Sequence, residues 1–204
     1  MHIAVTGNIG AGKTTLARKL SEHYKWEVLY EAVDGNPYLA DFYEDMSRWA
    51  FNLQIFFLNS RFAQAQKIRS MHYQTVIQDR TIYEDAFIFA KNLAESGNME
   101  PRDYENYLML YKTITNTVQA PDIIIYLKAD LPKLRRQIQK RGREFEQNIS
   151  DEYLLNLNKH YEDFAHQYLD GTLLTIEVDE LDFEANPEDF QYIVSRVNEV
   201  LGYR

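Results

Sequence analysis

One segment near the start of the chain restricts the possible folds more than any other feature. Residues 7–14 read Gly-Asn-Ile-Gly-Ala-Gly-Lys-Thr, which matches G-x-x-x-x-G-K-[ST] at every fixed position. The apolar residues 2–6 come directly before it, and residues 13–23 after it have a helical pattern. A glycine-rich turn between a strand and a helix predicts an α/β fold, with this turn at the carboxyl end of a strand.

The same segment is the clearest candidate binding site in the sequence. Glycines let the backbone curl so that several N–H groups point toward one phosphate, and the following helix adds its positive N-terminal end. In this pattern Lys13 contacts the outer phosphates and the Thr14 hydroxyl can ligate Mg²⁺. A turn that only connects strand to helix is the weaker interpretation. The candidate nucleotide-binding residues are Gly7, Asn8, Gly10, Ala11, Gly12, Lys13, Thr14 and Thr15.

A loop of this kind occurs in GTPase switches, in ATP-driven motors and in kinases. The sequence has no N-K-x-D segment and no D-x-x-G after the third predicted strand, which argues against a GTPase. Motors usually need longer chains or partner subunits. A kinase that acts on a small molecule is therefore the leading hypothesis.

Strand patterns alternate with helical patterns along the chain. Strands are predicted at residues 2–6, 27–30, 75–78, 122–127 and 172–178. Helices are predicted at residues 13–23, 46–70, 82–94, 101–118, 131–140, 150–169 and 187–201. This order predicts an α/β fold of the P-loop NTPase type, a doubly wound five-stranded parallel sheet flanked by helices, in a single domain of residues 1–204.

Composition excludes several classes of protein. The 204 residues include 22 Lys and Arg, 31 Asp and Glu and no cysteine, so the formal net charge is −9. The negative charge argues against a nucleic-acid partner, and the absent cysteines exclude disulfides, zinc–thiolate sites and a cysteine nucleophile. No apolar run approaches the roughly 20 residues of a membrane span, and the first residues lack a secretory signal pattern. We therefore expect a cytoplasmic protein without a membrane partner.

Charged residues occur where strands are predicted to end. Glu31 follows the second strand, and a carboxylate there can accept the proton of an attacking hydroxyl. Taken alone, Glu31 is more simply an exposed glutamate. Asp79 and Arg80 follow the third strand, where Asp79 can hold Mg²⁺ or its water and Arg80 can contact a phosphate or hold Glu31.

Two polar residues interrupt the mainly apolar helix predicted at residues 46–70. Gln54 and Arg61 share one helix face and have phenylalanine and leucine neighbours. A buried amide and a buried guanidinium need hydrogen-bonding partners. A flat nucleobase can supply them. The alternative is an internal pair, and Asp85 is a candidate partner for Arg61.

Residues 133–143 form a basic cluster in this acidic chain. Its members are Lys133, Arg135, Arg136, Lys140, Arg141 and Arg143, with no acidic residue between them. Arginines that close over a transferring phosphoryl group stabilise its negative charge, so an arginine-rich lid is predicted at residues 140–149. A solvated helix end with favourable charge placement is the alternative.

Taken together, these residues resemble the deoxyribonucleoside kinase family, and in particular its bacterial branch of deoxyadenosine, deoxyguanosine and deoxycytidine kinases. The phosphate loop, Glu31, the helix with Gln54 and Arg61, the Asp79-Arg80-Thr81 turn and Arg141-Gly142-Arg143 occur in the order and approximate spacing of that family. The resemblance implies transfer of the γ-phosphoryl group of ATP to the 5′-hydroxyl of a deoxyribonucleoside in nucleotide salvage. Deoxyadenosine ranks first as the substrate, and deoxyguanosine and deoxycytidine follow closely.

The resemblance also implies catalytic and metal-binding roles. Glu31 is then the base that deprotonates the 5′-hydroxyl, while Lys13 and Arg80 stabilise charge on the phosphoryl group. The magnesium ligands are Thr14 and Asp79.

Further roles follow for the ATP and nucleoside subsites. Arg141 and Arg143 are the lid arginines, and Phe183 packs on the adenine of ATP. Tyr43 and Glu146 bind the 3′-hydroxyl, Gln54 binds the base, and the Arg61–Asp85 pair disfavours thymidine. The implied substrate-binding residues are thus Tyr43, Gln54, Arg61, Asp85 and Glu146.

The resemblance further implies a homodimer packed through helices, with residues 46–70 and 82–94 as candidates, or a heterodimer with a paralogue. Two alternative functions stay open at this point. A nucleoside monophosphate kinase of the thymidylate kinase type shares the phosphate loop, the Asp-Arg turn and the lid. The second is a nucleotide-binding subunit of a heterodimer that has no activity of its own.

Overall fold

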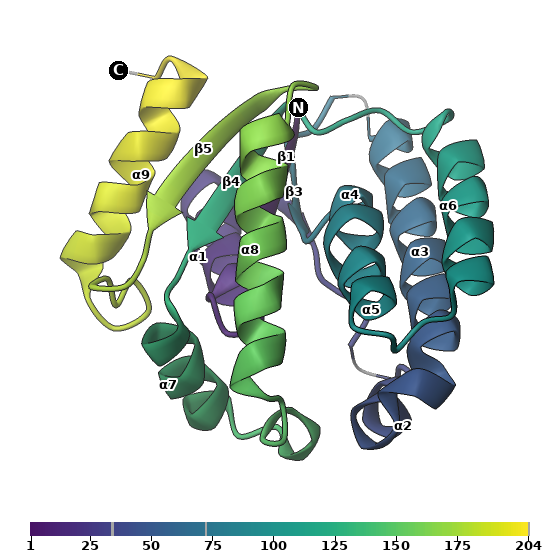
Figure 1. The fold of residues 1–204 in the computed structure, drawn as a ribbon. Coiled ribbons are helices and arrows are strands. Elements are labelled where there is room, and N and C mark those ends of the chain that lie inside the picture. Colours follow the sequence, from purple (N-terminus) through teal and green to yellow (C-terminus); the bar gives the residue numbers. More distant parts are fainter. Residues whose placement is uncertain (34, 72, 204) are drawn as a thin grey trace.

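The computed structural model describes residues 1–33, 35–71 and 73–203. Within these residues, five parallel strands form one sheet in the order β2-β3-β1-β4-β5 (Figure 1). The strands are β1 His2–Gly7, β2 Glu27–Leu29, β3 Val76–Asp79, β4 Ile123–Lys128 and β5 Thr172–Glu177. The predicted α/β fold and its five strands are confirmed, and each strand lies within one residue of its expected bounds.

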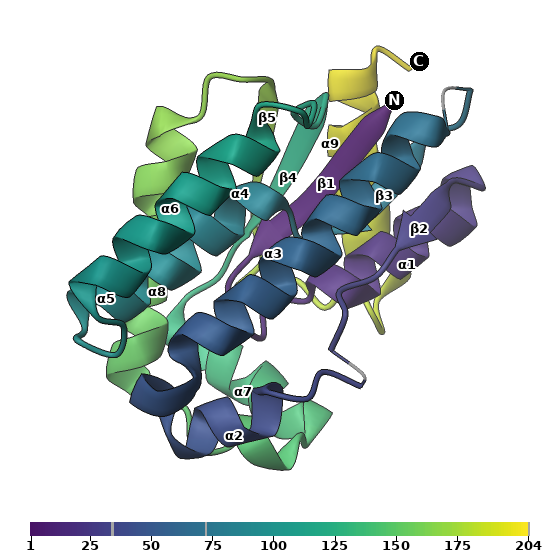
Figure 2. The same ribbon diagram turned by 90° about the vertical axis from the view of Figure 1, so that its right-hand side faces the viewer.

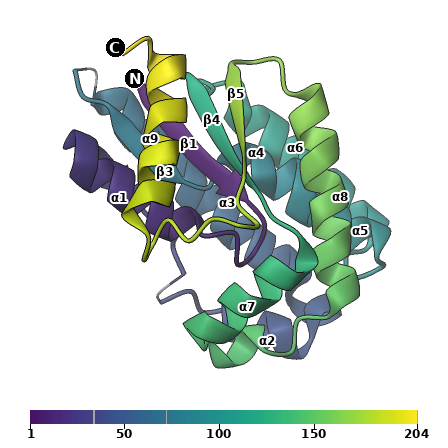
Figure 3. The ribbon, with the colours of Figure 1, turned by 90° about the vertical axis from the view of Figure 1, so that its left-hand side faces the viewer.

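Helices cover both faces of the sheet. They are α1 Lys13–Tyr24, α2 Leu39–Glu44, α3 Met46–Ser70, α4 Ile82–Glu84, the π-helix η1 Asp85–Ala90, α5 Lys91–Glu95, α6 Pro101–Thr115, α7 Leu131–Arg141, the 3-10 helix η2 Glu144–Glu146, α8 Asp151–Gln167 and α9 Pro187–Leu201. Figure 3 shows α1 and α9 in front of one face, and Figure 2 shows α3 and α6 over the other. None of the helices in the described part of the chain has the length and apolar character that crossing a membrane requires.

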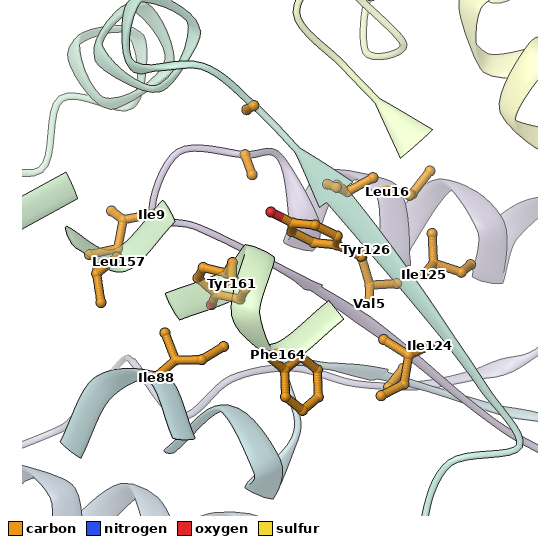
Figure 4. Close-up of a cluster of buried hydrophobic side chains, with 14 of the residues drawn as sticks. Val5, Ile9, Leu16, Ile88, Ile124, Ile125, Tyr126, Leu157, Tyr161 and Phe164 are labelled. Atoms are coloured by element: carbon orange, nitrogen blue, oxygen red, sulfur yellow. The ribbon is translucent and has the colours of Figure 1, made fainter. Parts of the chain in front are cut away.

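The core between β1, β4 and α8 explains the apolar runs of the sequence. Strands of a parallel sheet covered on both faces bury side chains on both sides, so β1 and β4 carry almost unbroken apolar stretches. In Figure 4, Val5 and Ile124 from the sheet lie near Tyr161 and Phe164 from α8. The Tyr126 ring stacks on the Tyr161 ring, with 5.7 Å between centroids. Packing of α8 on the sheet therefore supports the loops at the carboxyl ends of β1 and β4.

Two helical regions differ from the prediction. The single helix expected at residues 82–94 is divided into α4, η1 and α5, because residues 85–90 adopt π-helical hydrogen bonding. A pattern of apolar residues cannot distinguish an α-helical turn from a π-helical turn, because either can bury the apolar residues of one face. In this structure the buried residues include Ile82, Ala86 and Leu93. The helix α2 was not predicted, because six residues are too few to establish a periodic pattern.

Candidate active site

A cavity of about 570 Å³ brings together residues from distant parts of the chain. The predicted residues that line it are Gly10, Gly12, Lys13, Thr14, Thr15, Glu31, Tyr43, Gln54, Asp79, Arg80, Asp85, Arg141, Arg143 and Glu146. The other predicted residues, Gly7, Asn8, Ala11, Arg61 and Phe183, do not belong to this lining. α2 and α7 lie at the same end of the molecule, and both contribute to the walls (Figure 1).

The conformation of the phosphate loop depends on glycine and on contacts with α8. Gly12, the N-cap of α1, has φ of 95°, and a Cβ atom there would lie 2.7 Å from Cζ of Phe183. Asn8 Nδ2 donates hydrogen bonds to the carbonyl of Leu154 and to Oδ1 of Asn158, at 2.9 and 2.7 Å. Asn8 thus anchors the loop. The buried Phe183 ring packs beneath the loop, and its contact with adenine stays a prediction.

Lys13 is buried inside the loop. Its Nζ donates a 2.8 Å hydrogen bond to the carbonyl oxygen of Asn8. Burial, reinforced by the charge of Arg80, lowers the pKa of Lys13 to about 7, although Asp79 and Glu31 act in the opposite direction. Lys13 is therefore partly neutral near pH 7, and a bound triphosphate would restore its positive charge.

We expect ATP binding at pH 8 to take up about one proton per site, because the triphosphate raises the pKa of Lys13 from about 7. Affinity for ATP should fall as the pH rises above 7, since more of the lysine is then neutral in the free protein. Calorimetric titration in two buffers of different ionisation enthalpy measures the uptake. The Lys13→Met variant should show none, and uptake that persists in this variant would assign the proton to another group.

Glu31 is held between two arginines. Its Oε1 accepts a 2.8 Å hydrogen bond from Arg61 Nη2 and lies 2.9 Å from Arg80 Nε. Burial alone would raise the pKa of Glu31, but the charges of Arg80, Arg61 and Lys13 outweigh it and lower the pKa to about 2. The carboxylate is therefore ionised across the neutral pH range and faces the same cavity as the phosphate loop.

Arg80 is held by residues that the sequence analysis missed. Its Nη1 donates to the Tyr161 hydroxyl at 2.7 Å and to Oε2 of Glu84 at 3.1 Å. Tyr161 in turn donates to Glu84 at 2.7 Å, so the three side chains form a closed triangle. Arg80 has φ of 74°, a conformation that is rare outside glycine and gathers at functional sites. The Thr81-x-x-Glu84 spacing, which is that of a capping box, was the available signal for Glu84.

Thr14 and Asp79 provide oxygen atoms suited to a magnesium ion. The Thr14 hydroxyl donates a 2.5 Å hydrogen bond to Oδ2 of Asp79. Asp79 Oδ1 is buried and has no hydrogen-bond partner among the described residues. Within the same residues no group of three or more His, Cys, Asp or Glu side chains could hold a metal. Mg²⁺ keeps several waters and commonly binds one or two carboxylates together with substrate phosphates, so this pair fits it.

Another part of the cavity wall, formed by Gln54 and Asp85 with Arg61 outside the lining, carries buried polar atoms that have no hydrogen-bond partner among the described residues. Gln54 is 2% exposed, and within the described chain its Oε1 atom has no hydrogen bond. The same holds for Oδ2 of Asp85 and for Nε and Nη1 of Arg61, although Arg61 Nε lies 4.0 Å from Asp85 Oδ2. Burial raises the pKa of Asp85 to about 7, even though the charge of Arg61 lowers it. Unsatisfied buried polar groups cost free energy, so this wall is suited to a polar, flat ligand.

The arginines of the predicted lid share one carboxylate. Glu146 is 4% exposed and accepts hydrogen bonds from Arg141 Nη2 and, at 3.2 Å, from Arg143 Nη1. The adjacent Phe145 ring stacks on Tyr43, with 5.7 Å between centroids, which links this segment to α2. The lid segment thus reaches the acceptor side of the cavity. Its closing over a substrate stays a prediction.

Three other cations of the basic cluster, Lys133, Arg135 and Lys140, have structural partners. Lys140 pairs with Glu184 at 2.7 Å, and Arg135 pairs with Asp151 at 2.5 Å. The Nζ atom of Lys133 donates to the carbonyl of Leu181 at 2.5 Å. These contacts connect α7 with α8 and with the loop before α9. Lys140, the first residue of the predicted lid, also lines the cavity, and so does Gln137, which was not among the predicted site residues.

Comparison with known proteins identifies what this arrangement resembles. Residues 3–202 match the family model described as deoxynucleoside kinase. A deoxyguanosine kinase of Bacillus subtilis is 39% identical over 98% of this chain and 97% of its own length. A deoxyadenosine kinase of Lactobacillus acidophilus is 35% identical over 98% of this chain and 95% of its own length.

Solved structures show the same similarity in three dimensions. A deoxyadenosine kinase from M. mycoides with bound dATP superposes with a TM-score of 0.85 at 32% identity, covering 97% of this chain and 99% of that chain. The same kinase with dCMP and a flexible dCDP also gives 0.85, at 33% identity, over 98% of this chain and all (100%) of the other.

Proposed function

Because this chain belongs to the deoxynucleoside kinase family and is therefore a phosphotransferase, we propose how its cavity performs the reaction and which nucleoside it prefers. The γ-phosphoryl group of ATP is transferred to the 5′-hydroxyl of a deoxyribonucleoside, with deoxyadenosine as the preferred acceptor. Family membership favours this reading over the monophosphate kinase and over the inactive subunit. The homodimer and the cytoplasmic location stay predictions.

The proposed phosphoryl transfer rests mainly on the position of Glu31. Its carboxylate lies between Arg61 and Arg80 and lines the same cavity as Lys13. Glu31 accepts the 5′-hydroxyl proton while the hydroxyl oxygen attacks the γ-phosphorus in line. A carboxylate with a pKa of about 2 is a weak base at rest. The hydroxyl becomes strongly acidic as its oxygen bonds to phosphorus, so transfer to Glu31 becomes favourable late in the step.

Charge on the transferring group is stabilised from two sides. Lys13 and Arg80 line the cavity near the loop, and Arg141, the last residue of α7, and Arg143, two residues further, line it from the lid segment. In a loose phosphoryl-transfer transition state, negative charge spreads over the equatorial oxygens, which such cations stabilise. Thr14 and Asp79 would hold Mg²⁺, which would supply additional positive charge to the phosphates.

The unsatisfied atoms of Gln54, Arg61 and Asp85 support an amino-bearing base. An amide pairs in a bidentate manner with the amino group and neighbouring ring nitrogen of adenine. The Gln54 carboxamide has its oxygen free for such an amino group, and cytosine carries a comparable one. Two relatives carry names in line with this preference, a deoxyadenosine/deoxycytidine kinase of Bacillus subtilis and a deoxyadenosine kinase of Lactobacillus acidophilus, whereas the Bacillus subtilis relative that is 39% identical is a deoxyguanosine kinase.

A single acceptor panel tests the proposal. ADP release is measured with ATP and each of the four deoxyribonucleosides, and with dAMP and dTMP as acceptors. We expect turnover with deoxyadenosine above the other nucleosides and none with the two monophosphates. Turnover with dTMP alone would show that the protein is a monophosphate kinase. A preference for deoxyguanosine would contradict the proposed recognition of adenine by Gln54.

Base choice is expected to change when the buried pair is removed. The double variant Arg61→Met with Asp85→Ala should lose most activity toward deoxyadenosine and gain relative activity toward thymidine, because it makes room for the thymine methyl group. The ratio of kcat/KM values for the two nucleosides measures the shift. The Arg69→Met variant, at an exposed position of α3, serves as the control. An unchanged ratio would mean that the base is recognised elsewhere.

A further inference from the structure

The backbone that carries Glu31 lies at the edge of the sheet. β2 has three residues, ends at Leu29 and, in the part of the chain that the structure describes, pairs only with β3. Glu31 follows this short strand outside any helix or strand. The contacts with Arg61 and Arg80 fix its carboxylate, but they do not fix the peptide from which the side chain extends.

A side chain of α3 holds that peptide. Gln64 Nε2 donates a 2.7 Å hydrogen bond to the carbonyl oxygen of Tyr30, the residue before Glu31. Arg61 lies three residues earlier and therefore on the same face of α3. One turn of this helix thus contacts Glu31 through its carboxylate and through the preceding carbonyl group.

Two further side chains fix the orientation of the Gln64 amide. Gln64 Oε1 accepts a 2.9 Å hydrogen bond from Gln78 Nε2 on β3. Gln78 Oε1 lies 3.0 Å from His2 Nε2 on β1, so the imidazole donates to it. With His2 as donor, the side-chain amides of Gln64 and Gln78 each have only one orientation in which the oxygen accepts and the nitrogen donates a hydrogen bond. Gln78 is 3% exposed, and the contacts with Gln64 and His2 provide hydrogen-bond partners for its buried amide.

We propose that Gln64 is a positioning residue for the base Glu31, and that His2 and Gln78 set the orientation of its amide. The inference rests on the proposed role of Glu31. Gln64 is absent from the cavity lining, so it acts through the Tyr30 peptide and not on the substrate. A small displacement of the base weakens proton transfer more than it weakens nucleoside binding, since Gln54 and Asp85 form a separate wall.

The test compares Gln64→Met with Gln66→Met, a matched change at an exposed position two residues along the same helix. Active-site concentration is measured by nucleotide titration, so that misfolded protein does not count. We expect Gln64→Met to lower kcat about tenfold, with the KM for deoxyadenosine within about twofold of the original value. The Gln66→Met variant should match the unmodified protein. An unchanged kcat in Gln64→Met, or an equal loss in both variants, would overturn the inference.

A second measurement separates positioning from simple support of the fold. In a Glu31→Gln background, Gln64→Met should cause no further loss of kcat, because the group it positions is no longer a base. A tenfold loss in both backgrounds would overturn this inference alone. Full activity of Glu31→Gln by itself would overturn the proposed function and this inference with it. If Gln64→Met does not fold, Gln64→Glu replaces it, since a carboxylate accepts from Gln78 but cannot donate to Tyr30.

Discussion

Replacing Glu31 by glutamine is expected to lower kcat by about 10²–10⁴-fold, the usual contribution of a general base. The amide has nearly the shape of the carboxylate and can still accept hydrogen bonds from Arg61, but it cannot take the 5′-hydroxyl proton. The KM for deoxyadenosine should change little, because the cavity wall of Gln54 and Asp85, where we propose that the nucleobase binds, is unaltered. Steady-state phosphorylation of deoxyadenosine measures both constants.

The control for this variant is Glu27→Gln, an exposed change in the same short strand β2. It should leave kcat unaltered. The pH profile gives an independent check: the pKa of Glu31 is about 2, so its carboxylate is deprotonated from pH 4 upward. Loss of activity through protonation of Glu31 is therefore expected only as the pH falls toward 2. Normal activity in Glu31→Gln would show that another group takes the proton.

Removing both arginines of the lid segment should have an effect of similar size. The double variant Arg141→Met with Arg143→Met is expected to lower kcat by about 10³-fold or more, because arginines that contact a transferring phosphoryl group contribute on this scale. Each single variant should lose less, since the remaining arginine still pairs with the buried Glu146. Rapid-quench measurement of a single turnover separates this loss from changes in product release.

Arg136→Met is the matched control, because Arg136 belongs to the same basic cluster and is exposed on α7. It should keep full single-turnover activity. Affinity for ATP, measured by titration, should decrease far less than kcat in the double variant, since the phosphate loop remains intact. A normal single-turnover rate in the double variant would show that these arginines do not contribute to catalysis. The cluster would then be only a solvated helix end, the alternative left open from the sequence.

Much of the fold follows from local patterns in the sequence. β1 and β4 are continuous apolar runs, and such runs between helical segments specify buried parallel strands without knowledge of the rest of the chain. The phosphate loop is similarly local, because its glycines and the Lys13-Thr14 pair lie within one turn. Glu31, Asp79 and Arg80 could be placed in one cavity because parallel strands end at the same edge.

Contacts between distant segments could not be predicted in the same way. The sequence indicated Asp85 as a candidate partner of Arg61, whereas Arg61 lies closer to Glu31, at 2.8 Å, than to Asp85, at 4.0 Å. That difference depends on how α3 is rotated against β2, and the spacing of residues along the sequence does not determine this rotation. The contacts of Tyr161 and Gln64 depend in the same way on helix packing, so their roles became visible only in three dimensions.

The π-helical segment η1 bears on any effort to make this enzyme more heat-resistant. Such a turn is less regular than an α-helix, and deleting one of its residues would offer a route to better backbone geometry. The deletion would also rotate the residues before it by about 100° relative to those after it. Asp85 would then leave the wall that it shares with Gln54. If Asp85 contacts the base as we propose, thermal tolerance gained at this position would reduce substrate discrimination, so stabilising changes are better placed on exposed surfaces away from η1.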